Sequence, residues 1–272
     1  MRAYLLYFTL LLLVACSNEG TKETQGTEEM AETRRAEETK RRRSDSLEQI
    51  RKRQVEDSLA AEALKQEHVS YLDSVLRSYD LVDIQSIDST IRVGLRYASA
   101  NNFLGMDFYD GLQTAFFNCE TAIKLSNAQY YLKQKFPNYS LIVLDAARPK
   151  HIQQLMWDSL HMPPNEKYNY LTPPWEHSMH NLGCAADVSI IDLSTNTQLD
   201  MGTNFDAFDK LSEPIYERAF VESGELSKEA WQNRVLLRRC MLKARFICIS
   251  SEWWHFSSCD KPTGLAKYKL IK

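Results

Sequence analysis

The stretch SMHNLGCAAD at residues 178–187 places two side chains that can bind a metal ion close together in the chain. His180 offers an imidazole nitrogen and Asp187 a carboxylate oxygen, and a catalytic zinc site typically takes three such ligands from the protein. Residues seven apart, as these are, face opposite ways on a straight strand. Gly183 between them permits a bend that lets both meet one ion. Because an unpaired carboxylate in the following apolar run would be costly, the stretch predicts a pair of metal ligands.

A second stretch, SEWWHF at residues 251–256, sets a carboxylate and an imidazole among large aromatic rings. Apolar surroundings disfavour the charged form of a carboxylate, so we expect them to raise the pKa of Glu252 toward the range that suits a general base. His255 completes a desolvated acid/base pair with Glu252 in this interpretation. Taken alone, the stretch fits an ordinary aromatic core strand with one hydrogen-bonded histidine equally well.

A third stretch, DAARP at residues 145–149, follows a run of apolar residues typical of a buried strand. An arginine at the end of a strand, held by a following proline, is well placed to direct a rigid guanidinium into a cleft. Arg148 is therefore a candidate for binding a negative charge. By itself, however, this stretch fits a surface arginine at a strand exit better.

Together, the three stretches resemble the zinc D-alanyl-D-alanine dipeptidases of the VanX type, peptidase family M15. The shared patterns, in chain order, are D-x-x-R-P, S-x-H-x-x-G-x-A-x-D and E-W-W-H-F. Two further segments agree: YASANNFLG at 97–105 is similar to the family's Y-A-T-x-x-N-F-x-G, and MGTNFD at 201–206 to its M-G-T-x-F-D. The resemblance covers about residues 81–258. One departure is Ala147, where the family often has tyrosine, and this affects the shape of the pocket but not the metal.

This resemblance implies hydrolysis of the D-alanyl-D-alanine dipeptide to two D-alanines. It implies one zinc ion per chain, held by three ligands: His180, Asp187 and His255. It implies two catalytic side chains, the general base Glu252 and the oxyanion-stabilising Arg148. Three more positions match residues that hold the dipeptide: Tyr97, Ser178 and Asp206. Of these, Asp206 is the expected partner of the free ammonium group of the substrate.

Two other functions stay open on the sequence. A related zinc peptidase, such as a D,D-carboxypeptidase, would trim longer peptidoglycan stem peptides, and a catalytically silent lipoprotein would only bind the cell wall. The segments at 97–105 and 201–206 favour the dipeptidase, and the intact catalytic positions favour an enzyme. The net charge of −3 provides no basic field for a nucleic-acid partner.

The chain around these motifs predicts one α+β domain over residues 69–272. Helices are expected at 119–136, 149–160 and 227–245, with Ser227 as the N-cap of the last. Strands are expected at 140–144, 185–191 and 246–250. Because these elements lack the regular βαβ rhythm of a doubly wound fold, we expect a mostly antiparallel sheet flanked by helices.

A charged segment precedes the predicted domain. Residues 19–67 contain 13 acidic and 11 basic side chains and no aromatic residue, so they cannot form a core of their own. The basic block at 40–43 is nearly cancelled by neighbouring glutamates and is interpreted as a solvated helix face. We therefore expect residues 16–68 to be a charged stalk, helical or disordered.

The N-terminus has the features of an export signal. An arginine is followed by an apolar run at residues 3–15, which is too short to span a bilayer but suits a signal peptide. The ending LVAC at 13–16 resembles the lipobox of bacterial lipoproteins. Residues 1–15 are thus predicted to be removed and Cys16 to carry the lipid anchor. The expected location is the periplasmic side of the cell envelope, at the outer membrane.

Five further cysteines follow Cys16, at positions 119, 184, 240, 248 and 259. None has the C-x-x-C spacing of a structural zinc site. Two disulfides and one free thiol are compatible with the sequence, and the pairing stays open.

Overall fold

The computed structural model describes the backbone of residues 6–272 and the side chains of Thr27 and of residues 29–272. Backbone contacts divide the chain into two units, residues 1–63 and 64–272. The predicted signal peptide begins with five residues outside the described range, and the side chain of Cys16 also lies outside it. Export and lipidation therefore stay predictions.

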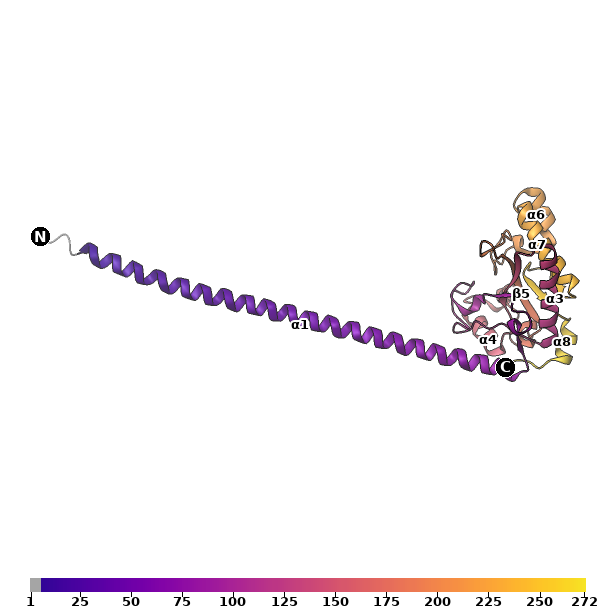
Figure 1. Ribbon diagram of the computed structural model, residues 1–272, viewed down its shortest axis with the longest axis horizontal. Helices are drawn as coiled ribbons and strands as arrows, with labels where there is room; N and C mark the ends of the chain where they lie inside the picture. Colours follow the sequence, from indigo (N-terminus) through magenta and orange to yellow (C-terminus); the bar gives the residue numbers. More distant parts are fainter. Residues whose placement is uncertain (1–5) are drawn as a thin grey trace. The chain divides into compact units, whose positions relative to one another are not determined.

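The first unit is helical wherever the structure describes it. Helix α1 begins at Leu6 and ends at Ser78, so its last turns belong to the second unit (Figure 1). Within residues 29–63 its apolar side chains are exposed, and ion pairs one turn apart, such as Arg42 with Glu38 at 2.7 Å, add modest stability. The stalk is thus helical, one of the two predicted states. Among residues with described side chains, no helix has the length and apolarity needed to cross a bilayer.

The second unit is built on a sheet with the strand order β2-β4-β5-β8-β7, and β6 pairs with β5. Its strands are β2 (Arg92–Val93), β4 (Tyr139–Asp145), β5 (Ala185–Asp192), β6 (Thr197–Gln198), β7 (Ile247–Cys248) and β8 (His255–Ser257). β2 and β4 run parallel, and the other pairs of this described sheet are antiparallel. A separate antiparallel pair joins β1 (Val82–Asp83) to β3 (Phe116–Phe117). The predicted α+β class with a mostly antiparallel sheet is confirmed.

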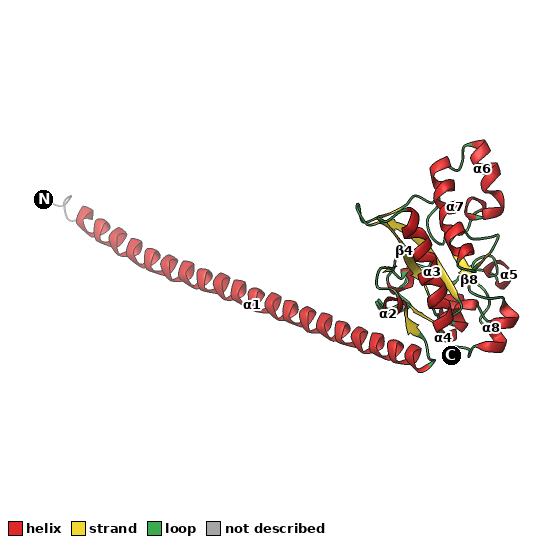
Figure 2. Ribbon diagram, turned by 45° about the vertical axis from the view of Figure 1, so that its right-hand side comes forward, coloured by secondary structure: helices red, strands yellow, loops and turns green. Residues whose placement is uncertain are grey.

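Two long helices cover one face of the sheet. α3 (Cys119–Lys135) and α7 (Lys228–Lys243) lie side by side, as Figure 2 shows, and contact β4 and β5. The main core forms between them and every second residue of the strands, for example Leu141 and Val143. α7 begins where the sequence predicts, because the Ser227 hydroxyl accepts a hydrogen bond from the backbone N–H of Ala230 at 3.0 Å.

Shorter elements complete the domain. The α-helices are α2 (Ile84–Ile87), α4 (Lys150–Ser159), α5 (Pro164–Lys167), α6 (Glu217–Ser223) and α8 (Lys261–Lys267). The 3₁₀ helices are η1 (Arg96–Ala98), η2 (Met179–Leu182), η3 (Lys210–Ser212) and η4 (Pro214–Tyr216).

One predicted strand is much shorter than expected. The apolar run at 246–250 suggests a five-residue strand, but β7 contains only Ile247 and Cys248, which pair with Ser257 and Phe256. Beyond Cys248 the chain leaves the sheet, and Ile249 and Glu252 line a cavity instead. The apolar residues thus serve two purposes, since Phe246 and Cys248 pack in the core whereas Ile249 faces the cavity.

Candidate active site

The central strands place three ionisable side chains in one row across the sheet. In the register of β4, β5 and β8, Asp187 pairs with His255 on one side and with Asp145 on the other. A bulge between Val143 and Asp145 shifts the end of β4. Because paired residues on antiparallel strands lie directly opposite each other, the register alone brings together residues far apart in the chain.

The 3₁₀ helix η2 carries His180 to this row. The Ser178 hydroxyl caps η2 by accepting a hydrogen bond from the His180 N–H, and Asn181 Oδ1 accepts one from the Ser178 backbone N–H at 2.8 Å. The helix ends at Gly183, whose φ of +63° turns the chain into β5. A side chain there would meet Leu81 at 2.9 Å, so glycine is required both for the turn and for close packing. The predicted bend between His180 and Asp187 is present.

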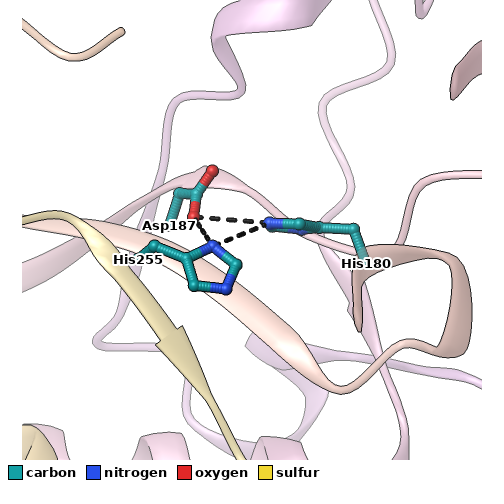
Figure 3. A group of neighbouring side chains, drawn as sticks. All are labelled: His180, Asp187 and His255. Carbon is teal, nitrogen blue, oxygen red and sulfur yellow. Dashed lines mark hydrogen bonds and ion pairs between the residues drawn. The ribbon is translucent and has the colours of Figure 1, made fainter. Parts of the chain in front are cut away.

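Figure 3 shows the resulting group, His180, Asp187 and His255. His255 Nδ1 lies 2.9 Å from Asp187 Oδ1, and His180 Nε2 lies 3.4 Å from the same oxygen. The two imidazole nitrogens are 3.3 Å apart. Within the described part of the chain, this is the one cluster of three or more potential ligands that could hold a metal ion.

The donor set fits a borderline transition metal such as zinc. Two imidazoles and one carboxylate match zinc, whereas calcium and magnesium prefer oxygen ligands. The outer nitrogen of His180, Nδ1, lies 2.7 Å from the carbonyl oxygen of Ala146, which leaves Nε2 directed into the group. Such a backbone contact is the usual way to orient a ligating imidazole.

The ionisable side chains of the metal-binding group shift one another's pKa values. Burial disfavours the carboxylate of Asp187, but His180 and His255 outweigh burial and hold the pKa of Asp187 below its ordinary value. Burial also disfavours the imidazolium of His255, yet the hydrogen bond and charge of Asp187 raise the pKa of His255. The single carboxylate of the group, Asp187, is thus held ionised, and a proton on His255 or a metal ion can neutralise its charge.

Glu252 enters the same cavity from the segment before β8. Burial raises the pKa of the Glu252 carboxyl above its ordinary value. Trp254, which is 1% exposed, lines the cavity beside it, and the rings of Trp253 and Trp254 meet edge to face. A carboxylate held in apolar surroundings next to a metal-binding group can accept and return a proton near neutral pH.

Arg148 is a buried residue that lines the cavity and does not lie on the surface. Its guanidinium makes a two-pronged contact with the Asp145 carboxylate and donates to Gln153 Oε1 at 2.8 Å. Burial disfavours the charge, but Asp145 outweighs burial and raises the pKa of Arg148. The guanidinium also lies 5.0 Å from the ring centre of Tyr97. The structure therefore excludes the alternative of a surface arginine for this motif.

Tyr97 and Asp206 also line the cavity. The Tyr97 hydroxyl donates to Asp206 Oδ2 at 3.0 Å, and Asp206 is 8% exposed. Burial, followed by the charge of Asp187, raises the pKa of Asp206 well above its ordinary value. A cationic group placed beside Asp206 would offset both effects.

All eight residues singled out in the sequence for the domain line one cavity of about 260 Å³. They are Tyr97, Arg148, Ser178, His180, Asp187, Asp206, Glu252 and His255. His177 lines the cavity too, with its Nδ1 buried and without a hydrogen-bond partner in the described structure. His151 and His161 do not line it.

Three supporting residues were not assigned a role from the sequence. Asp145 holds Arg148 and also accepts from the Tyr109 hydroxyl at 2.7 Å. Gln153, at 0% exposure on α4, links Arg148 to the carbonyl oxygen of Thr172 at 2.7 Å. The spacing of Asp145 and Arg148 in D-x-x-R-P was a usable signal, whereas nothing in the sequence points to Tyr109.

The fold and the site define a metallopeptidase: two imidazoles and a carboxylate form a metal-binding group, with a buried glutamate and arginine in the same cavity. Comparison with known proteins agrees. The family model for D-Ala-D-Ala dipeptidases, Peptidase_M15, matches residues 77–270. The chain therefore belongs to this family.

Curated relatives of this chain are named as D-alanyl-D-alanine dipeptidases. The D-alanyl-D-alanine dipeptidase of Escherichia coli (strain K12) is 30% identical over 178 residues, covering 65% of this chain and 83% of the relative. The D-alanyl-D-alanine dipeptidase of Enterococcus faecalis (strain ATCC 700802 / V583) is 27% identical over 185 residues, covering 63% of this chain and 88% of the relative.

Proposed function

We propose that this chain is a zinc-dependent dipeptidase that hydrolyses D-alanyl-D-alanine in the cell envelope. One observation carries the proposal: the metal-binding group, the buried carboxyl of Glu252 and the buried carboxyl of Asp206 all line one small cavity. The family and the names of the relatives support the same substrate. His180, Asp187 and His255 would hold the metal, one ion per chain.

Each remaining side chain has a role that follows from its position. Zinc, when bound, lowers the pKa of a coordinated water and polarises the scissile carbonyl. Glu252 takes a proton from the attacking water and returns it to the departing amine. Arg148 stabilises the negative charge that develops on the carbonyl oxygen, and because Asp145 and Gln153 already hold its guanidinium, little reorganisation is needed.

The buried carboxyl of Asp206 would account for a preference for a dipeptide over a longer peptide. Asp206 and Tyr97 would bind the free ammonium group, with Ser178 on the cavity wall nearby. A longer peptide has an amide at this position, which brings no positive charge to a buried carboxylate and needs space beyond it. The structure thus provides a physical reason to favour a dipeptidase over a D,D-carboxypeptidase.

The Glu252→Gln variant tests the mechanism. The substitution keeps the size of the side chain and removes its basicity, so zinc content should stay near that of the wild type while kcat falls by about 10²- to 10⁴-fold. The KM for D-Ala-D-Ala should change little. Loss of zinc would show that Glu252 is a ligand and not a base, and near-normal turnover would remove Glu252 from the mechanism.

Two substrate comparisons separate the alternatives. A dipeptidase should cleave D-Ala-D-Ala and reject both its N-acetyl derivative and a pentapeptide stem ending in D-Ala-D-Ala. Faster cleavage of the pentapeptide would favour the D,D-carboxypeptidase. No turnover of either substrate by the zinc-loaded chain would favour the catalytically silent wall-binding lipoprotein.

The location in the envelope rests on the sequence of the N-terminus. We infer that Cys16 is lipidated and that the helical stalk holds the domain away from the membrane. The Cys16→Ser variant should then appear in the soluble fraction after cell lysis without detergent, with its specific activity unchanged. Firm membrane association of this variant would contradict lipid anchoring.

A further inference from the structure

The segment that carries Asp206 lies outside the sheet and needs its own support. Strand register fixes Asp187 and His255 opposite each other, whereas residues 201–211 form a loop with the 3₁₀ helix η3 at its end. Asp206 itself has a φ of +59°, a left-handed conformation that is unfavourable for a side chain other than glycine and persists only when its surroundings impose it. Helix α7 contacts this loop on both sides of Asp206.

Arg234 on α7 closes this segment at both ends. It is 1% exposed, and its Nε donates to the carbonyl oxygen of Met201 at 2.5 Å while Nη1 donates to the carbonyl oxygen of Leu211 at 2.8 Å. One rigid guanidinium therefore fixes the first and last residues of the loop that has Asp206 near its middle. Lysine, with a single nitrogen at its tip, cannot reproduce this forked contact.

Thr203 links the same loop to the segment that carries Glu252. Its hydroxyl receives hydrogen bonds from the Trp253 indole N–H at 2.9 Å and from Arg234 Nη2 at 3.3 Å, and Ser212 bonds to it at 3.0 Å. Trp253 is the immediate neighbour of Glu252. A single hydroxyl thus connects the wall that would bind the ammonium group to the segment that would supply the base.

Gly202 and Glu217 complete the support of the loop at residues 201–211. Gly202 has a φ of +79°, and a Cβ there would lie 2.3 Å from Leu226 and 3.3 Å from Ala230 on α7, so glycine suits both the turn and the close approach of the loop to this helix. Glu217, 4% exposed, lies 3.7 Å from Arg234 Nη1 and pairs with Arg238 at 2.5 Å. The carboxylate of Glu217, which is shared with Arg238, therefore offsets part of the buried charge of Arg234.

We propose that Arg234 and Thr203 are positioning residues that set the distance between the ammonium-binding Asp206 and the base Glu252, and so determine the preference for a free amino end. This inference rests on the proposed dipeptidase function. Neither residue lines the catalytic cavity, so both act through the loop and not through contact with the substrate.

The test compares steady-state kinetics of full-length, zinc-loaded variants with D-Ala-D-Ala and with N-acetyl-D-Ala-D-Ala. Thr203→Val keeps the shape and removes one hydrogen-bonding group, so the KM for the dipeptide should rise about 2- to 10-fold with kcat changed less. Arg234→Lys keeps the charge and loses charge-assisted bonds, so the KM should rise about 10- to 100-fold. In both variants, the preference for the free amine over the N-acetyl form should fall by the same factor.

Matched controls separate positioning from general destabilisation. Thr203→Ser restores the hydroxyl and should return both the KM and the substrate preference to wild-type values. Arg239→Met on the exposed side of α7 and Thr197→Val in β6 should leave the kinetics unchanged. Should Arg234→Lys fail to fold, the Thr203 pair still decides the question.

The outcomes are distinguishable. A normal KM and substrate preference in Thr203→Val and Arg234→Lys, with only a lower Tm, would overturn the positioning role while the proposed function stands. If the wild-type chain does not turn over D-Ala-D-Ala, the proposed function fails first and this inference fails with it.

Discussion

The Asp145→Asn substitution removes the negative charge that holds the cavity-lining Arg148 and keeps the size of the side chain. Asp145 is fully buried and is held by the guanidinium of Arg148 and the hydroxyl of Tyr109. Removing one partner of a buried ion pair costs about 3–5 kcal/mol, because the other charge stays buried without compensation. Asparagine retains one oxygen acceptor, so we expect the lower end, about 3 kcal/mol.

This loss should be measurable both as stability and as turnover. In a domain of roughly 200 residues, 1 kcal/mol shifts Tm by about 2–4 °C, so thermal unfolding followed by circular dichroism should show a decrease of about 6–12 °C. Arg148 would also lose its orientation. Because a single misplaced oxyanion donor reduces kcat by about 10²- to 10³-fold, a decrease in kcat within or just below that range is expected.

A control on the surface makes the result interpretable. Asp158→Asn on α4 changes the same chemical group at an exposed position whose side chain accepts a hydrogen bond from Gln154. Its effect on stability should stay within about 0.5 kcal/mol. If Asp145→Asn changed Tm no more than this control does, the buried ion pair would not be the element that holds Arg148, and the reasoning would be refuted.

Three further outcomes follow from the site. His180→Ala should lose zinc whereas His177→Ala should keep it, since only the former belongs to the metal-binding group, and metal analysis of both preparations decides. Burial raises the pKa of the Cys184 thiol to about 12. Iodoacetamide near neutral pH should therefore label the exposed Cys119 and spare Cys184. Equal labelling of the two cysteines in peptide mass spectra would contradict this. Burial raises the pKa of Glu252 above its ordinary 4.5, and a general base must be ionised to act. The value of kcat/KM should therefore fall as the pH decreases through a point above 4.5. A fall that begins only at or below pH 4.5 would contradict this prediction.

Local sequence features predicted most of the regular elements. Helix α7 could be placed because Ser227 is a good N-cap, and α3 ends before Pro137 as a helix must. The long strand β5 is buried along nearly its whole length and is rich in apolar residues, which made it easy to recognise. Each of these signals is contained within a few neighbouring residues.

Features that depend on distant contacts could not be predicted in the same way. The hydroxyl of Tyr109 meets Asp145 because of how the loop before β3 packs, and no pattern around Tyr109 reflects that packing. The short β7 has the same cause: Ile249, just beyond it, faces a cavity, which local hydrophobicity cannot distinguish from a place in the sheet. The metal-binding group itself was recognisable mainly because its spacing resembles a known family.

The row of Asp145, Asp187 and His255 across three strands has a consequence for how such a chain can change length. Backbone hydrogen bonds between β4, β5 and β8 hold these positions opposite one another, so the number of residues connecting the strands does not enter the geometry. The exposed turn between β5 and β6, at residues 194–196, leads away from the row. Residues inserted at such a turn are absorbed at little entropic cost. The domain can therefore acquire new surface segments, or fuse to other modules, without rebuilding its catalytic chemistry.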